Sequence, residues 1–242
     1  MRAIAALCLA LAATPALAEP VHVMVRAQSE DAKFIGDHTG GVDVTLRDAA
    51  NGTVLAHGLI KGGTGDTARI MTQPQARGAA ITDAETAGYD AVIDIARPTL
   101  VEVVARGPLG YPAQAVTVRS TRWIVPGHPV AGDGWILKFP GLLVTPGVAR
   151  KADGTLHVTA TVTMLCGCPI APGGLWDAAR FAVTAQVLDG GTVLGTAPLA
   201  YAGEPSHFAA DLPRFAGHAD AVRIVATEAA PANAGVAEIP LP

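Results

Sequence analysis

Two cysteines separated by a single glycine form the part of this sequence best suited to chemistry. The segment reads Met164-Leu165-Cys166-Gly167-Cys168-Pro169. Cysteine forms disulfides and, as a thiolate, binds soft metals. Side chains i and i+2 of an extended strand point to the same side, about 6.5 Å apart at Cα, and a glycine between them lets the backbone bend. The spacing therefore predicts that Cys166 and Cys168 act as a pair.

Three interpretations of this pair remain open from the sequence. The first is a Cys166–Cys168 disulfide, which an oxidising compartment favours; its very short loop makes it weakly stabilising and easily reduced. The second is a soft-metal site, with copper as the candidate cofactor and Met164 as a thioether ligand. The third is a pair of inert thiols in the core. A structural zinc site is excluded, because it needs four ligands and the chain has only one further cysteine, Cys8.

Catalytic motifs are missing from the rest of the sequence. It contains neither a Gly-x-Ser-x-Gly elbow nor a His-Glu-x-x-His motif. The glycine-rich stretch 62–65 precedes a predicted strand, whereas a phosphate-binding loop precedes a helix. We therefore expect a protein that is not an enzyme.

The cysteines follow a segment with the period of a strand. Leu156, Val158, Ala160, Val162 and Met164 alternate with polar residues, as in a half-buried antiparallel strand. If this period continues, Met164, Cys166 and Cys168 lie on the core face, and Pro169 ends the hydrogen-bonded ladder.

Segments with the same period follow one another along the chain, and turn signals such as Asn51-Gly52 and Asp153-Gly154 separate them. A short helix within 78–88 is the one helical candidate. We expect strands at 21–27, 42–48, 53–60, 67–72, 90–96, 99–106, 115–124, 134–139, 142–146, 155–165, 180–188, 192–201, 206–212, 220–228 and 235–241.

These strands predict an all-β protein made of two immunoglobulin-like antiparallel β-sandwich domains. We place the first sandwich at 19–140 and the second, which carries Cys166-Gly167-Cys168, at 141–242. One long sandwich is the alternative. The three tryptophans, at 123, 135 and 176, are expected to fill the cores or pack between the domains, in preference to forming sugar platforms.

Residues 1–18 have the pattern of a secretory signal peptide. Arg2 precedes the apolar run Ala3–Ala13, and Ala16-Leu17-Ala18 supplies a cleavage site before Glu19. The run is shorter than the roughly 20 residues that span a membrane. We therefore expect a periplasmic or secreted protein without a transmembrane segment in the mature chain.

The charge of the chain bears on its partners. It has 17 Lys and Arg against 21 Asp and Glu, for a net charge of −4, and no basic cluster. Nucleic acids and anionic membrane surfaces are bound by clustered basic side chains. We therefore expect no nucleic-acid partner, and a protein partner in the periplasm instead.

Two fold-level resemblances fit these patterns. The stretch Val42-Asp43-Val44-Thr45-Leu46, the turn Asn51-Gly52, Thr53–Gly58 and Gly65-Asp66 resemble the repeat of carboxypeptidase-regulatory-like, or transthyretin-like, β-sandwich modules. The resemblance covers about thirty residues and implies a non-catalytic role in assembly or binding. The strand pattern of the second half is similar to that of exported sandwiches of the FixH and YtkA-like type.

The sequence therefore predicts a non-enzymatic exported binding or assembly module that carries a Cys-Gly-Cys site, with a soft metal such as copper as one candidate ligand of that site. A periplasmic thiol-redox or sulfur-transfer protein using Cys166 and Cys168 is the first alternative. A purely structural sandwich is the second. Neither the ligand nor the oligomeric state is specified by the sequence.

Overall fold

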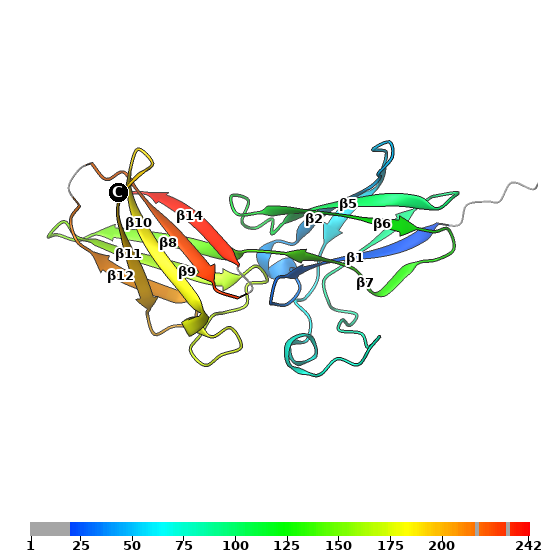
Figure 1. The fold of residues 1–242 in the computed structure, drawn as a ribbon, viewed down its shortest axis with the longest axis horizontal. Coiled ribbons are helices and arrows are strands. Elements are labelled where there is room, and N and C mark those ends of the chain that lie inside the picture. Colours follow the sequence, from blue (N-terminus) through cyan, green and yellow to red (C-terminus); the bar gives the residue numbers. More distant parts are fainter. Residues whose placement is uncertain (1–19, 216–217, 231–232) are drawn as a thin grey trace, which may run out of the picture.

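The computed structural model describes residues 20–215, 218–230 and 233–242. The expected signal peptide at 1–18 lies outside these residues. The described chain is all-β with sandwich-like sheets, and its strands run from β1 to β14. No helix within the described ranges is long and apolar enough to cross a membrane. Figure 1 shows two groups of sheets arranged end to end, one built from β1–β7 and the other from β8–β14.

Two sheets form the first group. A three-stranded sheet has the order β4-β1-β7, and a four-stranded sheet has the order β3-β2-β5-β6. The strands are β1 (Val21–Ser29), β2 (Val42–Asp48), β3 (Val54–Ile60), β4 (Tyr89–Ile93), β5 (Thr99–Gly107), β6 (Val116–Ile124) and β7 (Val130–Phe139). Their apolar residues meet in one buried cluster, in which Val25, Leu46 and Val103 are fully buried. The alternation seen in the sequence thus places one face of each sheet in a shared core.

The pairing of β1 with β7 departs from the predicted antiparallel arrangement. β1 pairs antiparallel with β4 but parallel with β7, with Ala27 opposite Leu137 and Ser29 opposite Phe139. Period-two patterning reports which face of a strand is buried but not the direction of its neighbour. This is why the sequence could not reveal the parallel pair.

A long excursion between β3 and β4 contains the other differences from the prediction. Residues Ala68–Thr72 form a π-helical turn, η2, where we expected a strand. The turn begins at Asp66, whose carboxylate accepts a hydrogen bond from the Arg69 amide at 2.7 Å. The short helix expected within 78–88 does not form. The buried Arg26 on β1 instead holds this segment by donating hydrogen bonds to the carbonyls of Thr86 and Ala87.

The second group is a seven-stranded sheet with the order β14-β13-β10-β11-β12-β9-β8. The strands are β8 (Leu142–Arg150), β9 (Leu156–Met164), β10 (Phe181–Asp189), β11 (Thr192–Tyr201), β12 (His207–Leu212), β13 (Ala221–Glu228) and β14 (Ala234–Pro240). The sheet curls until β14 approaches β8, so that it is nearly barrel-shaped. A Cβ on Gly235 would lie 2.4 Å from the Leu142 carbonyl oxygen, and glycine therefore allows this close approach.

The two groups share side chains where they meet. Only Pro140 and Gly141 separate β7 from β8. Leu143 and Leu165 from the second group pack into the core of the first, and Ala32 from the first group packs into the core of the second. The junction is therefore a packed interface, and the cysteine segment lies beside it.

Candidate functional site

Cys166 and Cys168 form a disulfide in the turn that follows β9. Their sulfurs lie 2.15 Å apart and their Cα atoms 5.4 Å apart. The Gly167 amide donates to the Met164 carbonyl at 2.8 Å, and the Met164 amide donates to the Cys168 carbonyl at 3.2 Å. Gly167 has φ +77°, in the left-handed region that glycine occupies without a steric cost. This is the pairing that the first sequence interpretation predicts.

The pair and its neighbour Met164 lie on the core side of the second sheet. Their exposed fractions are 0% for Met164, 1% for Cys166 and 5% for Cys168, as the alternation from Leu156 indicates. The described residues hold no group of three or more His, Cys, Asp or Glu placed to bind a metal ion. With both sulfurs used in a disulfide, copper binding by Met164, Cys166 and Cys168 stays a prediction for the reduced protein.

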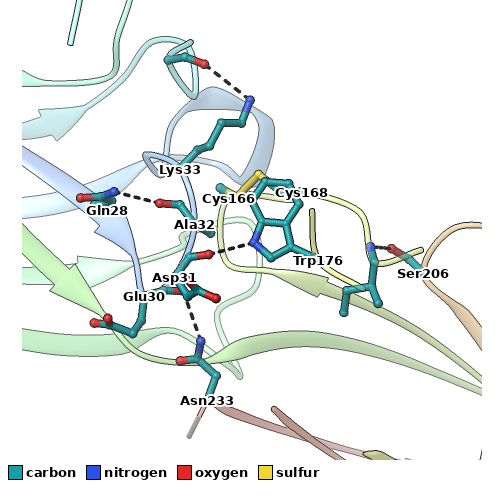
Figure 2. Close-up of a disulfide and its surroundings, with 12 residues drawn as sticks. Gln28, Glu30, Asp31, Ala32, Lys33, Cys166, Cys168, Trp176, Ser206 and Asn233 are labelled. Carbon is teal, nitrogen blue, oxygen red and sulfur yellow. Dashed lines mark hydrogen bonds between the residues drawn. A yellow bond between two sulfur atoms is a disulfide. The ribbon is translucent and has the colours of Figure 1, made fainter. Parts of the chain in front are cut away.

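The disulfide lines a cavity of about 460 Å³ between the two halves of the chain. Figure 2 shows the disulfide, Trp176 and Lys33 around this junction. Lys33, His38, Thr64 and Thr67 line the cavity from the first half, and Cys166, Gly167, Cys168, Pro169 and Trp176 line it from the second. Lys33 Nζ donates to the Gly65 carbonyl at 3.5 Å. The lining contains no carboxylate, so its charged groups are the Lys33 ammonium and, when protonated, the His38 imidazole.

The cysteine turn rests directly on the first half of the chain. The short 3-10 helix η1 (Asp37–Thr39) lies against Gly167. A Cβ on Gly167 would lie 2.2 Å from His38 Cδ2 and 3.3 Å from Thr39 Cγ2. A larger residue would therefore collide with the His38 ring as well as strain the backbone.

Trp176 and Arg180 bind the loop after β1 to the second half. The Trp176 indole donates from Nε1 to the Asp31 carbonyl at 2.8 Å, as Figure 2 shows. Arg180 Nη2 lies 2.8 Å from Asp31 Oδ2 and 2.7 Å from Glu228 Oε1. The hydrogen bond to Asp31 and the nearby charge of Glu228 raise the pKa of Arg180 despite its partial burial. One guanidinium thus links a carboxylate from each half.

Asn233 completes the junction from the loop between β13 and β14. Its exposed fraction is 2%. Its Oδ1 accepts from the Gly141 amide at 3.0 Å, and its Nδ2 donates to the Glu30 carbonyl at 3.2 Å and to Glu228 Oε2 at 3.1 Å. The Glu228 side chain is fully buried. Burial raises the pKa of Glu228, although Asn233 and Arg180 act in the opposite direction.

The tryptophans divide into two kinds. Trp135 and Trp176 are 7% and 6% exposed, which confirms the prediction that they pack in the cores or between the halves. Trp123 is 64% exposed, so the prediction was wrong for this residue. It lies near the end of β6, an edge strand of the four-stranded sheet, and on the outward face of that strand, whereas the next residue, Ile124, points into the core.

Several residues of the site were not found by sequence reasoning. Lys33 and His38 come from a loop more than a hundred residues before the cysteines, and no motif joins them. Asn233 is the clearest case, because one of its hydrogen bonds goes to the Glu30 carbonyl across the junction. Such contacts depend on how the two halves pack, which a pattern of alternating residues does not encode.

Comparisons with known proteins identify no family for this chain. No family model matches it, and no curated protein matches it. Among solved structures it is similar to the exo-chitosanase CsxA of Amycolatopsis orientalis, seen alone and as two variants in complex with PNP-beta-D-glucosamine. The TM-score is 0.26 at 14% identity, and the match covers 93% of this chain but 24% of the chitosanase. A likeness this low supports no argument about function. The comparisons point to neither of the two folds that the sequence resembles.

Proposed function

We propose that this chain is a non-enzymatic exported binding or assembly module that holds a protein partner in the disulfide-lined cavity. In this proposal it consists of two immunoglobulin-like sandwich units, 19–140 and 141–242, and functions in the periplasm after removal of residues 1–18. The supporting observation is the origin of the cavity walls. Lys33 and His38 come from one half and the Cys166–Cys168 turn from the other, so the site exists only when both halves are folded and packed.

The chemistry of the lining suggests the kind of partner segment. Its titratable side chains are Lys33 and His38, and it contains no carboxylate. Acidic side chains or carbonyl groups of a partner complement such a surface. The lining offers no free nucleophile next to a base, because the two sulfurs are bonded to each other. Binding is therefore better supported than catalysis.

A photo-crosslinking experiment tests this proposal in the full chain. A photoreactive amino acid replaces Thr67, which is exposed and lines the cavity, or Thr196, which is exposed on β11 away from it. After illumination of living cells, we expect a discrete protein adduct from position 67 but not from position 196. Adducts that are the same from both positions, or none from position 67, would contradict the proposal.

The second candidate is a thiol-redox or sulfur-transfer protein. It is favoured by the Lys33 ammonium and the His38 imidazole, which line the same cavity as the disulfide, because positive charge stabilises a thiolate. Thiol titration of the native protein with and without a mild reductant tests it, and Lys33→Met should raise the pKa of the reduced thiols. A disulfide that survives mild reductant in the native protein argues against this candidate.

Copper binding is tested on the same reduced sample. Uptake of about one equivalent of Cu(I), weakened in Met164→Leu, would support the soft-metal interpretation. A protein without adducts, reducible thiols or copper uptake would be the purely structural sandwich.

A further inference from the structure

An exposed tryptophan stands over a small pocket at the end of the four-stranded sheet, far along the chain from the cysteines. Trp123 is opposite Leu100 in the β5–β6 register. It is 64% exposed, whereas Trp135 and Trp176 are almost fully buried. Exposing an indole forfeits the stabilisation that burial of its large apolar surface would give. Its position therefore calls for an explanation outside the stability of the fold.

The pocket beside Trp123 has one wall that is fixed by hydrogen bonds. Its volume is about 230 Å³, and it is lined by Asp48, Ala50, Arg97, Pro98, Thr99, Leu100 and Trp123. The Ala49 amide donates to the Leu100 carbonyl at 2.9 Å, which joins the β2–β3 turn to β5. The Asp48 carboxylate accepts from the Ala50 amide at 2.8 Å and from Asn51 Nδ2 at 3.2 Å. These hydrogen bonds fix the wall formed by the β2–β3 turn and the start of β5.

The lining holds one anionic side chain, Asp48, and one cationic side chain, Arg97, and they differ in whether they already have partners. Both carboxylate oxygens of Asp48 already accept hydrogen bonds within the turn. The Thr99 hydroxyl donates to the Arg97 carbonyl at 2.9 Å. The Arg97 guanidinium makes neither a hydrogen bond nor an ion pair with any of the residues that the structure describes. Its five N–H donors are therefore available, and their planar arrangement suits a carboxylate.

We propose that this pocket binds one uronic acid ring of an acidic polysaccharide. The flat apolar face of the Trp123 indole packs against the C–H face of the sugar ring, and the Arg97 guanidinium binds the ring carboxylate through paired hydrogen bonds. The volume is below the roughly 300 Å³ at which pockets enclose drug-sized ligands. One ring fills it, and the rest of the polysaccharide extends into solvent.

A proline-rich peptide is the less suitable occupant. Grooves that recognise such peptides are lined by aromatic side chains along their length, and Trp123 is the one aromatic residue in this lining. A proline-rich peptide also offers no carboxylate to Arg97.

The uneven exposure of the tryptophans provides a direct assay. Acrylamide should quench the fluorescence of Trp123 in the folded protein and leave Trp135 and Trp176 largely protected. The probes are hexamers of galacturonate and of mannuronate, with the methyl-esterified galacturonate hexamer as the uncharged control. We expect at least one acidic hexamer to protect Trp123 from acrylamide, and the esterified hexamer to bind roughly tenfold more weakly, the loss expected for a hydrogen-bonded charge pair.

Matched variants separate the two contacts. Arg97→Gln should weaken binding of the acidic hexamer roughly tenfold and leave binding of the esterified one unchanged. Arg122→Gln, next to Trp123 on β6 but outside the lining, should change neither. Trp123→Ala removes the signal of the assay, so its binding is followed by calorimetry and should be lost.

Four results would overturn the proposal. The first is that neither acidic hexamer protects Trp123 at millimolar concentration. The second is that the acidic and esterified hexamers bind equally. The third is that Arg122→Gln weakens binding as much as Arg97→Gln does, which would indicate a diffuse charge effect. The fourth is that a proline-rich peptide protects Trp123 where the sugars do not, which would assign the pocket to a peptide.

Discussion

Asn233→Ala should loosen the junction between the two halves. The substitution removes the acceptor for the Gly141 amide and the donor to the Glu30 carbonyl and to Glu228 Oε2. Each buried polar group left without a partner costs about 1–3 kcal/mol. Because the three groups share one side chain, their costs are not additive, and we expect a total of about 3 kcal/mol. For a chain of this size that corresponds to a fall in melting temperature of about 6–12 °C.

Differential scanning calorimetry measures this effect, and the chain supplies its own control. Asn51 is the other asparagine in the sequence. It makes comparable hydrogen bonds in the β2–β3 turn but is exposed to solvent, so water replaces them in Asn51→Ala. We expect that variant to lose no more than about 0.5–1 kcal/mol. If Asn233→Ala lowers the melting temperature no further than Asn51→Ala does, the polar junction does not stabilise the protein as argued.

Three further predictions concern the polar contacts of the fold. Burial raises the pKa of Glu228 in the folded protein. The stability that this protonated side chain contributes is therefore fully present below the pKa of an unfolded glutamate, about 4.3. It is lost as the pH rises through the pKa of Glu228 in the folded protein. Glu228→Gln should therefore flatten the fall in stability across this range, and urea titrations that keep the same pH slope would refute this. The Asp133 carboxylate accepts hydrogen bonds from the Ile81 and Thr82 amides and from the Thr82 hydroxyl. Asp133→Asn should lower the free energy of unfolding, measured by chemical denaturation, by about 1–3 kcal/mol. An unchanged free energy would show that these hydrogen bonds do not hold the segment between β3 and β4 in place. Trp176→Phe removes the donor to the Asp31 carbonyl and should cost about 1 kcal/mol by the same measurement, whereas an unchanged midpoint would show that this bond contributes nothing.

The strands were largely predictable because their evidence is local. All but one of the expected strand segments coincide with observed strands, and even the buried face of Leu156–Met164 follows from alternation. The failure at 67–72 also has a local cause. The Asp66 carboxylate accepts from the Arg69 amide and starts a turn, and a capping side chain of this kind outweighs the weak strand preference of the following residues.

The candidate site was only half predictable. The pairing of Cys166 with Cys168 needs no more than their spacing and the bend at Gly167. The cavity beside them needs Lys33 and His38, which reach it through the packing of one half on the other. The exposure of Trp123 has a local cause. Trp123 shares the outward face of β6 with Thr117 and Arg119, whereas the next residue, Ile124, is buried, so the alternation of the strand already places the indole outside the core.

The parallel pairing of β1 with β7 has a consequence for how the protein is made. β1 is synthesised before either of its neighbours, which end at Ile93 and Phe139. β4 can pair with one edge of β1 first, but the other edge stays open until β7 has been synthesised. The first half therefore depends on contacts that are distant along the chain, a topology that folds slowly and leaves apolar strands open to aggregation. A chain that ends before Phe139 should therefore leave one edge of β1 unpaired, and the three-stranded sheet should close only once β7 is present.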